Sequence, residues 1–391
     1  MDSNLNLQTI LLLFFLVYVV EAQNGVFDIT AYGGKDGGDI TQAVMDAWKA
    51  ACAATGAATV LIPKGTYTMN LVNLAGPCKQ AQMNFQLEGI VQAPADPAAM
   101  DSESWLLFDH VDDLTVFGGG TLDGQGQKAW ESNECSKNSK CPQMPANLRL
   151  NFVNNGVVHD ITSLNSKMIH IMILSANNLT IQHVTITAPS TSINTDGIHI
   201  GRSTGVKILD TTIGTGDDCV SVSDGNKDIT VSKVTCGPGH GLSIGSLGKY
   251  DNEGPVVGVH ISDCTLTKTD NGVRIKSWPD SKPGSASDIS FENIVMNDVG
   301  NPVIIDQAYC PYGGCSQAPS RVKLSNIKIA GIKGTSSTQE AVKIFCSPAL
   351  PCENVEIGDI NLAFSGGAAT CTCANTKPTL TGTQVPPVVC T

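Results

Sequence analysis

The segment LTIQHVTI (Leu179–Ile186) carries apolar residues at its first, third, sixth and eighth positions. The same pattern returns, with Thr211 at one apolar position, in five later segments: VKILDTTI (Val206–Ile213), ITVSKVTC (Ile229–Cys236), VHISDCTL (Val259–Leu266), ISFENIVM (Ile289–Met296) and VKLSNIKI (Val322–Ile329). Successive segments start 23 to 33 residues apart. Alternating β-branched residues bounded by Gly, Asn and Asp predict strands. A repeat of this length predicts a solenoid, in which stacked coils share one core.

Shorter apolar segments lie between these strands and predict a second stack. They are GIHI (197–200), CVSV (219–222), GLSI (241–244), GVRI (272–275) and PVII (302–305). The short period excludes a propeller, and the missing Leu/Asn pattern excludes leucine-rich repeats. We therefore expect an all-β chain that folds as a parallel β-helix.

The two ends of the solenoid are expected to differ. Thr41–Ala53 has one apolar stripe and predicts a helix, which Asp39 would cap and which would cover the first coil. The region from Ala369, rich in Thr, Pro and Cys, predicts an irregular end stapled by disulfides. No linker separates these parts, so we expect residues 23–391 to form one domain.

The composition of the whole chain narrows its class. Its 391 residues are 41% hydrophobic and 15% charged, which is too apolar for a disordered chain. The net charge of −12 argues against a general nucleic-acid binder. The glycine-rich stretch Gly118–Gly126 is not expected to open a helix, so we do not expect it to bind phosphate.

The N-terminus predicts export. Ile10–Val20 is apolar but short for a bilayer span, and it leads into Val20-Glu21-Ala22, which is typical of a signal peptide (residues 1–22) cleaved after Ala22. The preceding residues contain Asp2 and no Lys or Arg, which departs from that pattern. A buried N-terminal strand or helix is the alternative. We expect a secreted protein, extracellular or in the cell wall, with no membrane association after cleavage.

All 14 cysteines follow this segment, as expected for disulfides formed in an oxidising compartment. Three short spacings predict loop staples: Cys135/Cys141, Cys310/Cys315 and Cys346/Cys352. Cys371 and Cys373 lack a matching Cys or His pair, so no zinc site is expected. Asn178-Leu179-Thr180 is an acceptor sequence for N-glycosylation.

Polar residues interrupt the second stack at one edge. If Gly197, Cys219 and Gly241 start equivalent strands, the residues before them align from coil to coil at about 4.8 Å. Those preceding residues are Asp196, the pair Asp217-Asp218, and His240. The strand residues that alternate with the core positions are expected to face outward beside these acids: His199, Ser221, Ser243, Arg274 and Lys276. Tyr309 follows the next coil and is expected to border the same groove.

This arrangement points to a particular chemistry. Carboxyl groups this close cannot all ionise at ordinary pKa values, so one is expected to keep a proton near neutral pH. A proton donor beside a base is what glycoside hydrolysis needs, and Arg274 and Lys276 would hold an anionic sugar. Considered one at a time, these residues need no functional site: each Asp is explained as a turn residue, and the His and the two cations are explained as solvated side chains. Their common register favours a site. Ser221 and Ser243 lack the G-x-S-x-G context of a nucleophile.

Four motifs connect these residues with a known family: Asn194-Thr-Asp-Gly197, Gly216-Asp-Asp218, Gly239-His-Gly241 and Arg274-Ile-Lys276. In this order they resemble the signature motifs of polygalacturonases, which hydrolyse pectin and fold as right-handed parallel β-helices. The resemblance runs from about Phe27 to Cys390 and is strongest to plant pollen-type exo-acting members. One departure, AYGG at Ala31–Gly34 where the family usually has D-Y-G-A, lies away from the motifs.

The resemblance implies a role for each site residue. Asp217 would be the general acid, and Asp196 and Asp218 would activate water so that the configuration inverts. His240 would tune the acid. The remaining residues would bind galacturonate: Asn194, Arg274, Lys276 and Tyr309. The resemblance also implies no metal or cofactor, and polygalacturonate or pectin as the substrate. The acidic composition predicts no nucleic-acid partner, and we expect a monomer.

Three alternatives remain open on the sequence. Exo action from the non-reducing end requires a groove closed at one end, for which the loop bounded by Cys135 and Cys141 is a candidate; endo action is the alternative. A calcium-dependent pectate lyase shares the scaffold, but the Asp217-Asp218 and Gly239-His-Gly241 motifs disfavour it. A non-catalytic, pectin-binding wall protein is the third possibility.

Overall fold

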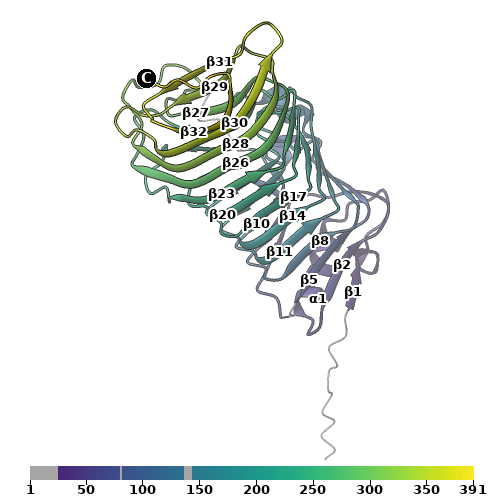
Figure 1. Ribbon diagram of the computed structural model, residues 1–391. Coiled ribbons are helices and arrows are strands. Elements are labelled where there is room, and N and C mark those ends of the chain that lie inside the picture. Colours follow the sequence, from purple (N-terminus) through teal and green to yellow (C-terminus); the bar gives the residue numbers. More distant parts are fainter. Residues whose placement is uncertain (1–24, 80–81, 136–142) are drawn as a thin grey trace, which may run out of the picture.

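The structure, a computed structural model, describes residues 25–79, 82–135 and 143–391. It is a right-handed parallel β-helix, in which successive coils stack along one axis (Figure 1). The strands form a 21-stranded sheet and an 11-stranded sheet, called here sheet A and sheet B. The fold expected from the repeat is confirmed. The expected signal peptide lies outside the described residues, and within those ranges no helix has the length and apolar character needed to cross a membrane.

Sheet A contains the eight-residue segments, and each of them bends in the middle. LTIQHVTI spans β14 (Asn177–Gln182) and β15 (Thr185–Thr187), and His183 lies between them at φ 51°. The equivalent fifth residue has φ of 45 to 57° in the other segments: Asp210, Lys233, Asp263, Asn293 and Asn326. This left-handed residue shifts the side-chain alternation by one, so the third and sixth residues both face the core.

The other strands of sheet A follow the same path around the coil. They are β1 (Gly25–Asp28), β2 (Ala58–Ile62), β3 (Thr66–Thr68), β5 (Met83–Leu87), β6 (Ile90–Gln92), β8 (Leu114–Phe117), β9 (Thr121–Asp123), β11 (Asn154–His159), β12 (Thr162–Leu164), β17 (Lys207–Leu209), β18 (Thr212–Gly214), β20 (Lys227–Ser232), β21 (Thr235–Cys236), β23 (Val256–Ser262), β24 (Thr265–Thr267), β26 (Gly284–Val299), β28 (Val322–Ser336), β30 (Glu353–Phe364) and β32 (Thr379–Val385).

Sheet B contains the shorter segments. Its strands, in stacking order, are β4 (Val72–Ala75), β7 (Ser104–Asp109), β10 (Ala146–Asn151), β13 (Ile171–Leu174), β16 (Ile198–Gly201), β19 (Val220–Val222), β22 (Leu242–Leu247), β25 (Asn271–Ser277), β27 (Asn301–Asp306), β29 (Glu340–Phe345) and β31 (Thr370–Ala374). Ile198 pairs with Val220, Val220 with Leu242, and Leu242 with Val273. This is the register predicted from the sequence, and these side chains are buried in the core.

The ends of the solenoid agree only partly with expectation. Helix α1 (Thr41–Ala53) has the predicted bounds and lies against β1, β2 and β4 at the N-terminal end. Asp39 Oδ1 accepts a hydrogen bond from Thr41 N at 2.8 Å, although Ile40 occupies the N-cap position. The prediction of an irregular C-terminus was wrong, because β31 and β32 extend both sheets by one more coil.

Disulfides staple several of the turns. The predicted pairs Cys310–Cys315 and Cys346–Cys352 are confirmed. Cys135 is disulfide-bonded, and Cys141 lies outside the described residues. Further bridges join residues that are more distant in the chain: Cys52–Cys78, Cys219–Cys236 and Cys373–Cys390. Cys264 and Cys371 carry free thiols.

Three short helical turns were not predicted. Helix α2 (Gln127–Ser132) follows Gly126 directly, so the expectation that the glycine-rich stretch does not open a helix was wrong. The indole Nε1 of Trp130 in α2 donates to Ser166 O at 2.9 Å, which ties this turn to a neighbouring coil. The two 3-10 turns are η1 (Ile29–Tyr32) and η2 (Pro97–Ala99).

Candidate active site

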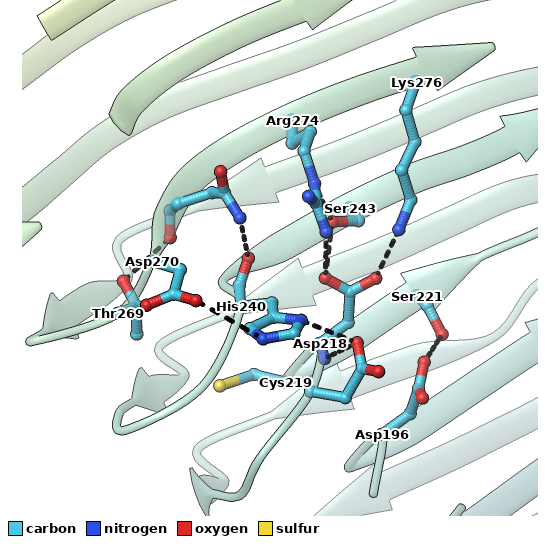
Figure 2. Close-up of polar contacts among 12 residues, drawn as sticks. Asp196, Asp218, Cys219, Ser221, His240, Ser243, Thr269, Asp270, Arg274 and Lys276 are labelled. Carbon is cyan, nitrogen blue, oxygen red and sulfur yellow. Dashed lines mark hydrogen bonds and ion pairs between the residues drawn. The ribbon is translucent and has the colours of Figure 1, made fainter. Parts of the chain in front are cut away.

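Charged side chains converge where β16, β19 and β22 begin at the edge of sheet B (Figure 2). The backbone ladder continues through the preceding turns, because Gly197 N donates to Asp218 O and Cys219 N donates to Gly241 O, both at 2.8 Å. Asp196, Asp218 and His240 therefore occupy equivalent positions of three successive coils. The outward ladder His199–Ser221–Ser243–Arg274 is also present as expected.

Asp218 is clamped by two cations. Arg274 Nη2 lies 2.7 Å from its Oδ1, and Lys276 Nζ lies 2.8 Å from its Oδ2. Ser243 Oγ also donates to Oδ1 at 2.8 Å. Burial by itself would raise the pKa of the Asp218 carboxyl, but Lys276 and Arg274 outweigh burial and hold that pKa well below its ordinary range. Asp218 is therefore held as a carboxylate near neutral pH.

Asp196 is in the opposite electrostatic situation. Burial, and next the negative charges of Asp217 and Asp218, raise the pKa of its carboxyl well above the ordinary value. Its Oδ2 accepts a hydrogen bond from Ser221 Oγ at 2.8 Å, which in part counteracts this rise in pKa. The hydroxyl of Ser221 lies 2.8 Å from His199 Nδ1, and burial lowers the pKa of His199 to about 4. A neutral imidazole thus supports Asp196 through Ser221.

Asp217 is the carboxyl that borders an open pocket. His240 Nδ1 lies 2.9 Å from its Oδ1, and Asn194 Nδ2 donates to its Oδ2 at 3.3 Å. Burial lowers the pKa of His240, but the hydrogen bond and charge of Asp217 outweigh it, so the net pKa is raised. The pocket has a volume of about 350 Å³. Asn194, Asp217, His240 and Tyr309 are among its lining residues.

Asn194 marks this pocket as a place for a polar ligand. Its backbone lies in the left-handed region at φ 57°, and its Oδ1 is buried without a hydrogen-bond partner among the described residues. A buried acceptor left unpaired is costly, so a hydroxyl donor from a ligand would stabilise it.

Tyr309 closes the site on the side of the next coil. Its ring centroid lies 5.2 Å from Lys276 Nζ and 6.0 Å from Arg274 Cζ, and it packs edge-on against Trp278 at 5.5 Å. Trp278 in turn stacks on Tyr312, which borders the same pocket as Asp217. Trp278 and Tyr312 were not predicted from the sequence, although both lie within three residues of a predicted site residue.

The structure thus brings the predicted residues together, but two of them make a contact that was not expected. Arg274 and Lys276 were expected to meet a ligand directly, but both contact Asp218. Asn178, the predicted glycosylation acceptor, is exposed on β14 of sheet A, and its Nδ2 donates to Asn155 Oδ1 at 2.8 Å.

One group of ligand atoms has a spacing suited to a metal ion. Atoms of Asp217, Asp218 and His240 lie within 4.8 Å of one another. However, Asp218 already binds two cationic side chains, and His240 is bonded to Asp217. A metal ion would have to compete with these contacts.

Residues 52–384 match the profile of a known family, described as Glycosyl hydrolases family 28. The chain belongs to glycosyl hydrolase family 28. An exopolygalacturonase of Platanus acerifolia is 56% identical to this chain, over 95% of this chain and 99% of the relative's own length. An exopolygalacturonase of Oenothera organensis is 51% identical over 90% of this chain and 98% of its own. The fold is shared with a solved structure, the endo-xylogalacturonan hydrolase of Aspergillus tubingensis (TM-score 0.80, 24% identity, 94% of this chain and 99% of that one).

Proposed function

We propose that this family 28 protein is an exopolygalacturonase. It hydrolyses α-1,4-linked galacturonan, removes galacturonate from the non-reducing end, and inverts the configuration of the released sugar. The relatives of 56% and 51% identity both carry that name and are matched over almost their whole length. The bridges between half-cystines support action outside the cell, where disulfides persist. Cleavage after Ala22 and a monomeric state are part of the same proposal.

The observation that carries the catalytic proposal is the contrast among the three carboxyl groups. Asp218 is held ionised by Arg274 and Lys276, Asp196 has a raised pKa, and Asp217 borders the pocket beside His240. Three adjacent groups with such different surroundings can share one proton near neutral pH. An inverting glycosidase needs this state, with one carboxylic acid and one carboxylate base.

In the proposed reaction, Asp217 gives its proton to the glycosidic oxygen as the bond to the anomeric carbon breaks. Water attacks that carbon from the opposite face and gives a proton to Asp196. One proton therefore enters the leaving group, and one returns to the carboxyl groups of Asp196, Asp217 and Asp218, called here the carboxyl trio. Asp196 is the better base because its pKa is raised, whereas the carboxylate of Asp218 accepts protons poorly and instead orients the water. The trio is reset when the proton returns to Asp217.

The two cations have a double role in this proposal. They keep Asp218 ionised, and together they carry one positive charge more than that carboxylate neutralises. This surplus, next to the ring of Tyr309, would attract the carboxylate of a galacturonate residue.

Chromatography of the products from polygalacturonate tests the proposal most directly. We expect galacturonate monomer to be released with slow loss of viscosity, and we expect the Asp217→Asn variant to lose about 10²- to 10⁴-fold in rate. Oligomers with rapid viscosity loss would indicate endo action. Unsaturated, ultraviolet-absorbing products that require calcium would indicate a lyase, and saturable binding without turnover would indicate a wall-binding protein.

A further inference from the structure

A second cavity lies on the outer face of sheet B. It has a volume of about 420 Å³ and includes Gly245 and Ser246 near the end of β22. His199 lines this cavity and is linked to Asp196 through Ser221. A sugar chain that enters the Asp217 pocket and crosses the carboxyl trio would therefore continue into this cavity.

Three cationic side chains line this second cavity, and they differ in their partners. Arg149 Nη1 lies 2.8 Å from Glu103 Oε2, and Arg202 Nε lies 3.2 Å from Asp224 Oδ2. Lys249 has no ion pair with a carboxylate among the described residues. Its Nζ instead lies 5.3 Å from the ring centroid of Tyr250 and 5.1 Å from that of Trp278. Contact with a ring face leaves ammonium N–H donors available for an anion.

The loop that carries Lys249 is held by a single carboxylate. Glu253 accepts hydrogen bonds from the backbone N–H groups of Gly248 at 2.6 Å, and of Lys249 and Tyr250 at 2.8 Å. Glu253 thus uses its acceptors within the loop and forms no ion pair with Lys249. The result is a preorganised cation beside an exposed aromatic ring, a combination suited to a sugar that carries a carboxylate.

We propose that Lys249 binds the carboxylate of a galacturonate residue next to the scissile bond, and that Glu253 is the positioning residue that holds it there. The inference rests on the proposed function, and it makes this cavity selective for free acid over methyl ester. A methyl ester has no negative charge, so it loses most of the attraction to an ammonium group.

Steady-state kinetics on polygalacturonate and on methyl-esterified pectin test this assignment. We expect Lys249→Met to raise KM for polygalacturonate about 10-fold, the lower end for a hydrogen bond to a charged group, with kcat within about twofold. KM for the esterified substrate should change less than about twofold, and Lys249→Arg should restore most of the affinity. Lys49→Met, the same change on the exposed face of α1, is the matched control.

The role of Glu253 is tested in the same assay. Glu253→Gln should raise KM in the parent enzyme but add little in the Lys249→Met background, because both changes remove one interaction. An unchanged KM in Lys249→Met, or an equal rise for both substrates, would overturn the assignment. If the parent releases no sugar, the proposed function fails instead. Calorimetric binding of trigalacturonate to Asp217→Asn, with and without Lys249→Met, then decides the inference without turnover.

Discussion

Lys276 Nζ lies 2.8 Å from Asp218 Oδ2, and the two side chains are only 9% and 2% exposed. The pair joins residues 58 positions apart in sequence, across two coils of sheet B. With Arg274 on the other oxygen, Asp218 is the only carboxylate of the described residues that forms an ion pair with these two nearly buried cations.

Replacement of this carboxylate should therefore affect both stability and activity. Asp218→Asn leaves Arg274 and Lys276 without their partner, and we expect a loss of about 3–5 kcal/mol in the free energy of unfolding. Asp217→Asn weakens the contacts of that side chain with His240, Asn194 and the backbone N–H of Asp218, but leaves no buried cation without a partner, and should cost about 1 kcal/mol. Both variants should lose most of their activity, by about 10²- to 10⁴-fold for Asp217→Asn. Urea unfolding at neutral pH measures the difference in stability. Equal midpoints for the two variants would contradict the role of Asp218 as the ionic partner of Arg274 and Lys276.

Asp196→Asn should have the opposite effect on stability. The raised pKa of Asp196 means that the folded chain binds this proton more tightly than the unfolded chain. Stability must therefore fall as the pH rises from the ordinary pKa of an aspartate toward the raised value. Asn at this position never ionises, and its Oδ1 can still accept from Ser221. We expect the variant to be more stable than the parent by roughly 1 kcal/mol at about pH 8, and equal to it at about pH 4.

Thermal unfolding of both proteins across this pH range is the measurement, and the same samples should show lost hydrolysis in the variant. A variant less stable than its parent at the alkaline end would show that Asp196 is not a strained carboxylate.

Ser221→Ala tests the base through its supporting hydroxyl. The hydrogen bond from Ser221 lowers the pKa of Asp196, so its removal should raise that pKa further. Because the base must be ionised, the acidic limb of the profile of kcat/KM against pH should move to higher pH. Activity on the plateau should remain close to that of the parent. Ser243→Ala, which removes the equivalent contact to Asp218, is the comparison, and it should leave the position of the acidic limb unchanged.

The sequence allowed much of this site to be predicted because a parallel β-helix converts spacing into position. Once GIHI, CVSV and GLSI are placed in register, Asp196, Asp218 and His240 must stack, whatever the turns between them do. Apolar alternation identifies such strands, and stacking of successive coils supplies the third dimension.

The partners of each side chain could not be predicted in this way. Lys276 crosses two coils to reach Asp218, and that reach depends on rotamers rather than on register. His199 appeared only as an outward residue, and its link to Asp196 needs the Ser221 hydroxyl in the ladder between them. The bend at His183 and its equivalents was not predicted either, although five of these six residues are His, Asp or Asn, the types that most often adopt a left-handed backbone.

His240 provides a direct spectroscopic test of the proposed acid. In the parent, Asp217 raises the pKa of His240 against the effect of burial, so the imidazole should titrate above its ordinary value. In Asp217→Asn the opposing effect of burial remains while the main favourable contact is lost, so the pKa of His240 should fall.

Asp270 also lies 3.4 Å from His240 Nε2, but its side chain is 77% exposed, and Asp270→Asn should shift the titration of His240 much less. NMR titration of the imidazole resonances separates these cases, with His199 as an internal reference that stays neutral down to about pH 4. A His240 titration unaffected by Asp217→Asn would show that this histidine does not act on the proposed acid.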